Sequence, residues 1–231
     1  PTGIDAIDMV SGGSPANCVL SWLAPAKCGK STLLIDSIVA NLKQGRVCSA
    51  YTIEMSMEQF MHRVYCNYAD VSFEAISKKT YTEIEKKRLI EKTIEFKELY
   101  SDKFFIYSTN DGLTAKHVEG HVKNIGKTGI IVQDIFIDYL QILDSYSKNN
   151  ASKPEKMAEL PKEIRLLRQK TGARIFVPMQ SLTSSREKSI ENWSPDDIYF
   201  SKEAEREFDH VCAMKQEDGF VKWKPLVSRF S

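Results

Sequence analysis

The chain has almost no excess of charge of either sign. Its 231 residues include 32 lysines and arginines against 31 aspartates and glutamates, which gives a formal net charge of +1. This balance excludes a protein that binds nucleic acid through a uniformly basic surface, so any such contact must come from local loops. With 42% hydrophobic residues the chain can bury a sizeable core, and its length fits one α/β domain over residues 1–231.

Paired cysteines and long apolar runs are also missing. The five cysteines are an odd number without a Cys-x-x-Cys pair, which favours free thiols in a reducing cytoplasm over a disulfide framework. The longest apolar segment, residues 130–143, is interrupted by Gln133, Asp134 and Asp138, so we expect no membrane span and no signal peptide. The four histidines show no metal-ligand spacing. Because the chain starts at Pro1 and stops directly after an apolar segment, we expect a piece of a longer protein.

A phosphate-binding loop is the most informative feature that is present. An apolar run, Val19 to Leu23, precedes it and apolar residues spaced four apart follow it, so the segment reads as strand, loop and helix. The backbone N–H groups of such a loop point inward at a helix N-terminus and bind anions. Lys30 would reach the β- and γ-phosphates of a nucleotide, and the Ser31 hydroxyl would bind Mg²⁺. The predicted nucleotide-binding residues are Ala24, Pro25, Ala26, Lys27, Cys28, Gly29, Lys30, Ser31 and Thr32.

Asp138 decides between this interpretation and an ordinary turn. By composition alone, a Gly-Lys-Ser/Thr triplet occurs in about one chain in ten of this length. Here the apolar residues Ile135 to Ile137 lead into Asp138, which places a carboxylate at the end of a strand beside the loop. At that position a carboxylate can hold Mg²⁺ through water. The two segments together predict a site for ATP and Mg²⁺ in a nucleotide-driven motor.

Helical and extended patterns alternate along the chain, which predicts a mostly parallel, twisted sheet flanked by helices. The expected strands are 47–53, 104–107, 135–143, 174–179, 210–215 and 221–230, the last two joined by a hairpin turn at Glu217-Asp218-Gly219. The expected helices are 56–68, a charged helix that begins at Thr80 with Glu83 as its capping partner, 114–125, and a helix in which Pro161 introduces a kink or sets the start. A long mobile loop is expected at 144–156.

Several short motifs occur in a characteristic order. They are Thr-Gly-Ile-Asp-Ala-Ile-Asp at 2–8, the phosphate loop, Ile-Glu-Met-Ser at 53–56, Ile-Asp-Tyr-Leu-Gln at 137–141 and Gln-Ser-Leu at 180–182. This order resembles the RecA-like ATPase domain of DnaB-type replicative DNA helicases, with the phage branch most similar. Ala24 stands where the generic loop has glycine, and DnaB-type helicases often carry alanine there. The resemblance covers essentially the whole chain and implies a RecA-like P-loop NTPase.

The resemblance implies roles for three further residues beside Lys30 and Asp138 in the catalytic set. Glu54 would orient or deprotonate the attacking water, Gln180 would sense the γ-phosphate, and Arg229 would act in trans as an arginine finger. Each has a simpler alternative: a solvated strand-end carboxylate, a turn cap and an edge-strand cation, respectively. The family usually ends its core with Lys-x-Arg, where this chain has Val-Ser-Arg at 227–229, so only the arginine carries over.

The resemblance also implies partners. A helicase of this type forms a homo-oligomeric, hexameric ring on single-stranded DNA in the cytoplasm of a bacterial or phage-infected cell, with a primase or a loader protein as candidate partners. Four cations of the loops 144–156 and 181–190 would meet DNA phosphates, although charge in a loop more often serves solvation. They are Lys148, Lys153, Arg186 and Lys188. A RecA- or KaiC-like recombinase or regulatory ATPase and a P-loop subunit that binds nucleotide without hydrolysis are the alternatives.

Overall fold

A mostly parallel sheet forms the centre of the structure, a computed structural model that describes residues 2–4, 8–9, 13–109, 111–146, 152–198 and 201–229. In these ranges the sheet has eight strands in the order β3-β2-β4-β5-β1-β7-β8, with β6 paired to β1, and only the β7–β8 pair is antiparallel. The predicted fold class is therefore confirmed. The strands are β1 (Val19–Ala24), β2 (Cys48–Thr52), β3 (Phe104–Ser108), β4 (Asp134–Asp138), β5 (Arg174–Phe176), β6 (Met179–Gln180), β7 (His210–Glu217) and β8 (Phe220–Ser228).

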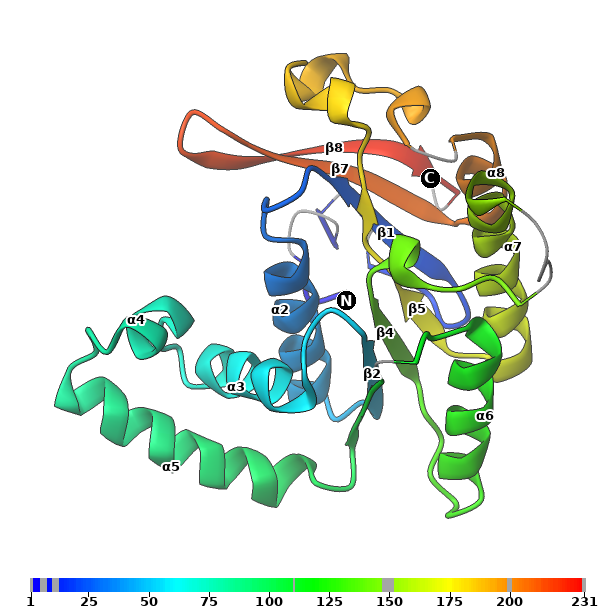
Figure 1. The fold of residues 1–231 in the computed structure, drawn as a ribbon. Helices are drawn as coiled ribbons and strands as arrows, with labels where there is room; N and C mark the ends of the chain where they lie inside the picture. The colour runs from blue at the N-terminus through cyan, green and yellow to red at the C-terminus, as the bar shows by residue number, and fades with distance from the viewer. Residues whose placement is uncertain are drawn as a thin grey trace.

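Helices cover both faces of this sheet (Figure 1). Three of them, α2, α3 and α5, lie over one face, and α6, α7 and α8 lie over the other. Successive residues of β4 serve the two cores: Phe136 packs with Phe176 on the first face, whereas Ile135 and Ile137 belong to the second. The helices are α2 (Lys30–Lys43), α3 (Met57–Tyr68), α4 (Phe73–Lys78), α5 (Glu83–Tyr100), α6 (Ala115–Gly126), α7 (Lys153–Thr171) and α8 (Ser201–Glu207).

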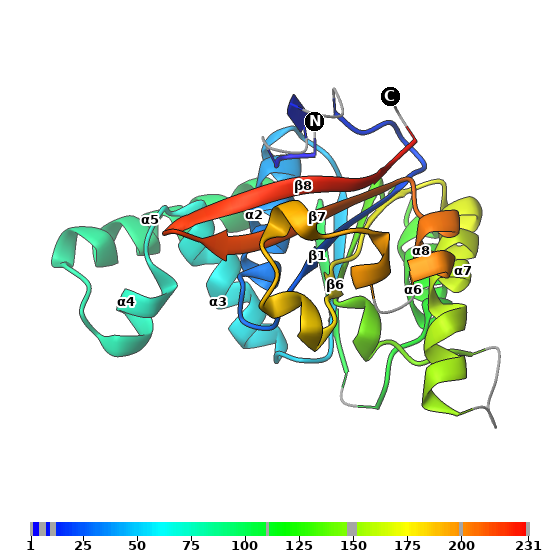
Figure 2. The same cartoon turned by 90° about the horizontal axis from the view of Figure 1, so that it is seen from above.

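The helical pair α4 and α5 extends away from the sheet, as Figure 2 shows from above. None of the helices in the described ranges combines the length and the apolar character that crossing a membrane requires.

Strand register brings the phosphate loop and three of the predicted catalytic residues, Glu54, Asp138 and Gln180, to one edge of the sheet. Because β1, β2 and β4 are parallel, their carboxyl ends lie together. Thr52 of β2 pairs with Asp138 of β4, and Ala24 of β1 pairs with Gln180 of β6. The phosphate loop, Glu54, Asp138 and Gln180 therefore leave the sheet side by side.

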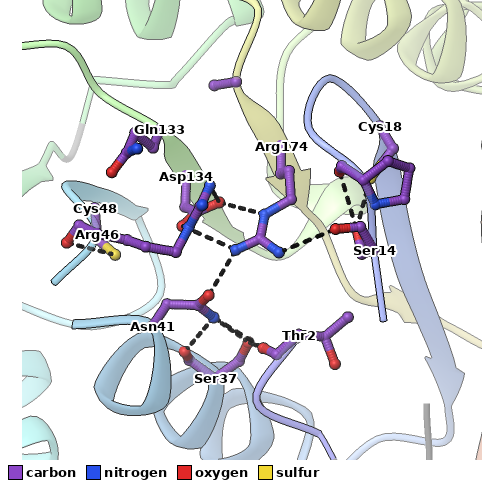
Figure 3. Close-up of polar contacts among 12 residues, drawn as sticks. Thr2, Ser14, Cys18, Ser37, Asn41, Arg46, Cys48, Gln133, Asp134 and Arg174 are labelled. Carbon is purple, nitrogen blue, oxygen red and sulfur yellow. Dashed lines mark hydrogen bonds and ion pairs between the residues drawn. The ribbon is translucent and has the colours of Figure 1, made fainter. Parts of the chain in front are cut away.

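A buried polar network at the opposite edge anchors α2, the helix that follows the phosphate loop (Figure 3). Arg174 donates to Asp134 Oδ1 at 2.6 Å and to Asn41 Oδ1 at 2.6 Å, and Asn41 Nδ2 donates to the Thr2 carbonyl at 2.8 Å. These bonds tie the last turn of α2 to β4, β5 and the first residues of the chain. The network comprises Thr2, Ser37, Asn41, Arg46, Asp134 and Arg174.

The helix expected to begin at Thr80 begins two residues later, which corrects the predicted cap. Thr82 Oγ1 accepts the Glu85 amide at 3.2 Å, and Glu85 accepts the Thr82 amide at 2.7 Å, so the capping box is one threonine further along. The Thr80 amide is already used, since it donates to the Ala75 carbonyl at 2.9 Å and closes α4. Both Thr-x-x-Glu spacings fit the sequence signal, and the preceding helix decides between them.

One predicted strand ends early and another is interrupted. The strand expected over 135–143 stops at Asp138, and a 3-10 turn follows at Leu140–Ile142, because the Leu140 amide donates to the Pro178 carbonyl instead of continuing the sheet. The strand expected over 174–179 is divided into β5 and β6 around Pro178, which has no N–H to offer.

The remaining boundaries agree with the sequence in part. The expected hairpin is confirmed: Asp218 and Gly219 both have positive φ, 54° and 79°, as a two-residue turn between β7 and β8 requires. The helix α7 begins at Lys153, inside the expected loop 144–156, and continues through Pro161 to Thr171. Residues 147–151 of that loop lie outside the described ranges.

Candidate active site

The phosphate loop ends in a helix start whose backbone N–H groups have no acidic cap. Gly29 is the N-cap of α2, with φ 82° and no side-chain capping bond, and Lys27 also has positive φ, at 65°. No acidic residue occupies the first turn of α2. Open space surrounds Gly29, but its left-handed backbone disfavours any side chain there. The loop therefore presents a free, positive helix end to an anion.

Lys30 lies folded back over this loop. Its side chain is buried, and Nζ donates to the carbonyls of Pro25 at 3.0 Å and Ala24 at 3.5 Å. The Tyr139 ring lies beneath the ammonium group, with its centroid 5.7 Å from Nζ. Burial lowers the pKa of Lys30, and the nearby Cys28, Asp138 and Glu54 oppose that shift. The ammonium group is thus held by weak carbonyl partners that phosphate oxygens can replace.

Ser31 and Asp138 form the second part of the site. Ser31 Oγ donates to Asp138 Oδ1 at 3.0 Å, whereas the buried Oδ2 has no hydrogen-bond partner among the described residues. Burial raises the pKa of Asp138 to about 6; the Ser31 bond and Lys30 lower it, and Glu54 raises it further. An unsatisfied, buried carboxylate oxygen beside a hydroxyl is a donor set that suits Mg²⁺.

Glu54 enters the site from the turn between β2 and α3. Thr52 Oγ1 accepts the Met55 amide at 3.3 Å, Ser108 Oγ donates to the Met55 carbonyl at 3.2 Å, and Ser56 caps α3. This pinned turn presents the exposed Glu54 carboxylate to the cleft above Lys30 and Ser31. The carboxylate can accept a proton from, or orient, a water molecule in the cleft.

Hydrogen bonds to the backbone of Gln180 hold this residue in place, so its side chain stays available to the cleft that it lines. The Gln141 side chain donates to the Gln180 carbonyl at 2.9 Å and accepts the Gln180 amide at 3.1 Å. The next amide, of Ser181, donates to the Ala24 carbonyl at 3.0 Å. The segment that carries Gln180 is therefore tied both to the phosphate loop and to the turn after Asp138.

Lys30, Ser31, Glu54 and Gln180 line one cleft of about 510 Å³, and Asp138 is hydrogen-bonded to Ser31 without lining the cleft itself. Three lining residues, Met55 after Glu54, Arg63 of α3 and Tyr139 after β4, received no role from the sequence. Tyr139 lies within the Asp-Tyr-Leu-Gln motif, so its position was available as a signal, whereas no spacing rule connects Arg63 to the cleft. The lining residues are Ala26, Lys27, Gly29, Lys30, Ser31, Thr32, Glu54, Met55, Arg63, Tyr139 and Gln180.

The loop cations predicted to bind DNA differ in their surroundings. Lys188 Nζ donates to Asp197 Oδ1 at 2.8 Å, and this aspartate is buried. Arg186 is exposed and makes no ion pair with a described residue, and its charge acts on Lys30. Lys148 lies outside the described residues, and of Lys153 only the backbone, at the start of α7, is described.

Arg229 lies far from the cleft of its own chain. It follows β8, which runs antiparallel to β7 and so ends at the opposite edge of the sheet from the phosphate loop. Its amide donates to the Asp209 carbonyl at 3.0 Å, and its guanidinium donates to the carbonyls of Glu205 and Arg206 in α8. The structure thus does not bring Arg229 together with the other predicted catalytic residues of the same chain.

Comparison with known proteins adds a family to this geometry. The family model described as the DnaB-like helicase C-terminal domain matches residues 1–224. The chain is 19% identical over 224 residues to the replicative DNA helicase DnaC of Bacillus subtilis (strain 168), with 96% of this chain and 48% of that protein covered. It is 22% identical over 195 residues to the replicative DNA helicase DnaB of Helicobacter pylori (strain J99), with 83% and 37% covered. The chain thus spans less than half the length of these relatives.

Two solved structures share the fold. One, described as an ATPase domain, superposes with a TM-score of 0.86 at 14% identity, covering 99% of this chain and 83% of that one. The other, a DnaB-like replicative helicase described together with its interactions with primase, gives a TM-score of 0.86 at 14% identity, with 99% and 56% covered. At this identity the likeness concerns the fold, which is that of RecA-like ATPase domains.

Proposed function

The chain belongs to the DnaB-like helicase C-terminal domain family, and from this premise we propose that it is the ATP-hydrolysing motor domain of a ring-forming replicative DNA helicase. The observation that carries the proposal is the convergence of Lys30, Ser31, Glu54 and Gln180 on one cleft, with the buried Asp138 hydrogen-bonded to Ser31. A phosphate-binding lysine, a hydroxyl–carboxylate pair, a second carboxylate and an amide are the groups that phosphoryl transfer to water requires.

Binding of the triphosphate uses the loop and Lys30. The N–H groups at the start of α2 bind phosphate oxygens, and the Lys30 ammonium exchanges the Ala24 and Pro25 carbonyls for the β- and γ-phosphates. Ser31 and Asp138 would hold Mg²⁺, because Asp138 Oδ2 is a buried acceptor without a hydrogen-bond partner among the described residues. When bound, Mg²⁺ neutralises charge that develops on the phosphate oxygens.

Hydrolysis and its coupling to DNA use the other side of the cleft. Glu54 orients the attacking water and accepts its proton. Gln180 contacts the γ-phosphate, and loss of that contact after hydrolysis moves the segment that follows, residues 181–190. Because this segment is tied to Ala24 through the Ser181 amide, a change at the phosphate loop reaches it directly.

The whole assembly is a homo-hexameric ring with single-stranded DNA in its channel. Lys148, Lys153, Arg186 and Lys188 line the DNA path in this proposal, and Arg229 reaches the nucleotide of the neighbouring subunit. A primase and a loader protein are the further partners, in a bacterial or phage-infected cytoplasm. Since Arg229 lies at the edge opposite the cleft, its role in trans requires a neighbour that presents this edge to the site.

Strand displacement tests this function against its alternatives. The protein should hydrolyse ATP faster with single-stranded DNA, form a hexamer with a non-hydrolysable ATP analogue and DNA, and displace a strand from a fork. Filaments that promote strand pairing without displacement would identify a recombinase instead. Tight ATP binding without any hydrolysis, in an intact oligomer with DNA, would identify a nucleotide-binding scaffold subunit.

A further inference from the structure

Arg63 is a cation of the cleft to which the sequence analysis assigned no role. It lies on α3, nine residues after Glu54, and lines the cleft together with Lys30 and Glu54. Its guanidinium makes no hydrogen bond or ion pair with any described residue, and the side chain is half-buried. A guanidinium that has five donors and no polar partner is available for an anionic ligand.

Phe73 holds this guanidinium in place. The Arg63 Cζ atom lies 4.6 Å from the centroid of the Phe73 ring, at the start of α4. Ser72 fixes that start, since its hydroxyl accepts the Ala75 amide at 3.2 Å. Stacking on an aromatic ring orients the plane of a guanidinium but leaves its N–H groups unused. Arg63 also lines a second cavity of about 140 Å³, with Thr32 and Phe73, so its side chain forms the wall between that cavity and the cleft.

The charge balance of the cleft calls for such a cation. Glu54 lines the cleft and Asp138 is bonded to Ser31, and a bound triphosphate would add further negative charge to these carboxylates. The phosphate loop contributes Lys27 and Lys30 as cations to the lining. Arg186, on the loop after Gln180, acts on Lys30 from a distance but does not line the cleft. Arg63 does line it, and its charge acts on the Asp138 carboxyl. The charge of Arg63 thus acts on the carboxylate that is predicted to hold Mg²⁺.

We propose that Arg63 is a phosphate-binding residue that contacts the terminal phosphate of the triphosphate bound to its own chain, and that Phe73 is its positioning residue. This inference rests on the proposed function, because it needs a triphosphate in the cleft. Lys30 approaches that phosphate from the loop and Arg63 from α3, on the side of Glu54. Arg63 is therefore distinct from a cation supplied by a neighbouring subunit, and its effect does not depend on ring formation.

Nucleotide affinity, measured calorimetrically with ATP and with ADP in the presence of Mg²⁺, tests the assignment. Arg63→Ala should weaken ATP binding about tenfold to a hundredfold, as expected for one or two charge-assisted hydrogen bonds, and ADP binding less than about threefold. Arg63→Lys should recover part of the ATP affinity. Phe73→Ala should lose ATP affinity selectively but less strongly, and Phe73→Tyr should restore it, since either ring can support a guanidinium.

A matched control separates this effect from the loss of any stacked cation. Lys97 of α5 lies over the Tyr65 ring of α3, 5.9 Å from its centroid, outside the cleft. Lys97→Ala should leave both affinities unchanged, and all variants should keep the thermal unfolding midpoint of the wild type within a few degrees. The inference alone would be overturned if the wild type binds ATP but Arg63→Ala binds it with the same affinity. It would also be overturned if Arg63→Ala loses affinity equally for ATP and ADP. If the wild type binds neither nucleotide, the proposed function fails and the inference fails with it.

Discussion

Among single residues, the buried Asp138 makes the stability of the folded protein depend on pH. Burial raises the pKa of its carboxyl from 3.8 to about 6, so ionisation costs folding free energy in the metal-free protein. The folded state holds the Asp138 proton more tightly than the unfolded state does. Stability should therefore fall as pH rises from about 4 to about 6 and change no further above that, by on the order of 3 kcal/mol in total.

Replacement of this carboxyl by a neutral amide tests that cost. Asp138→Asn should be more stable than the wild type at neutral pH and equally stable near pH 4, in denaturant unfolding with a chelator present. Asp111→Asn, which changes an exposed aspartate, should follow the wild-type curve. If Asp138→Asn unfolds at lower denaturant concentration than the wild type throughout this pH range, Asp138 is stabilised by partners that the described residues do not include.

Whether a single site residue could be predicted depended on its distance from a strand end. Asp138 ends one apolar run and Lys30 lies in the loop that follows another, and parallel strands end at one edge of a sheet, so their convergence follows from the pattern alone. Arg63 reaches the same cleft only because α3 turns back over the sheet and Phe73 supports its guanidinium. Such a position depends on tertiary packing, for which a basic residue within a helix gives no periodic signal.

At the scale of elements, the buried Asp197 carboxylate holds the loop after Gln180 in place through hydrogen bonds. This carboxylate accepts Ser185 Oγ at 2.7 Å, Lys188 Nζ at 2.8 Å and the Ser194 amide at 2.9 Å. Burial alone would raise the pKa of Asp197, but these three bonds outweigh it and hold the pKa below its ordinary value. Lys188 is therefore partly neutralised where it lies, whereas Arg186 is free to meet a phosphate.

Single-stranded DNA binding over a range of salt concentrations should distinguish these two cations. Arg186→Ala should weaken binding and reduce the slope of log K against log salt by about 0.7, the value for one lost phosphate contact to a single strand. Asp197→Asn should instead strengthen binding and steepen the slope, because it releases Lys188. Glu187→Gln removes an exposed negative charge from the same loop and serves as the control for net charge. Equal slopes in all four proteins would place the DNA path elsewhere.

The errors in element boundaries also have local causes that only the fold discloses. Thr80 and Thr82 both precede a glutamate by three residues, and the choice of Thr82 depends on the end of α4, which uses the Thr80 amide. The apolar run 174–179 is uniform enough for one strand, yet Pro178 divides it and its carbonyl ends β4 through the Leu140 amide. Propensity predicts that these elements exist, whereas neighbouring elements determine where they stop.

For the whole molecule, the sheet order separates Arg229 from the cleft. Because β8 runs antiparallel to β7, Arg229 lies at the edge opposite the phosphate loop. There its guanidinium donates hydrogen bonds to carbonyls of α8. The mostly parallel sheet and its C-terminal hairpin were predictable from alternating patterns and a turn signal, whereas the strand order was not predicted. The surfaces that meet in a ring are not, because one chain contains only half of each interface.

Mixed rings provide the test of Arg229. Subunits with Lys30→Ala and subunits with Arg229→Ala should each be inactive alone and regain part of the ATPase activity when assembled together, since some interfaces would combine an intact loop with an intact arginine. Loss of an arginine finger reduces turnover by about 10³ to 10⁵, which is easily measured. An Arg229→Ala ring as active as the wild type, or no recovery in mixed rings verified by mass, would assign Arg229 a purely structural role on α8.

The claim that this cleft is the ATPase centre of a DNA motor is tested most directly by ATP turnover in Glu54→Gln, with single-stranded DNA present and ATP affinity measured in the same preparation. The substitution keeps the size of the side chain and leaves Lys30, Ser31 and Asp138 in place, so ATP should bind with an affinity close to that of the wild type. Turnover, which DNA stimulates in the wild type, should fall by about a hundredfold or more, because the water is no longer activated. Near wild-type, DNA-stimulated hydrolysis by an intact Glu54→Gln oligomer would contradict the account.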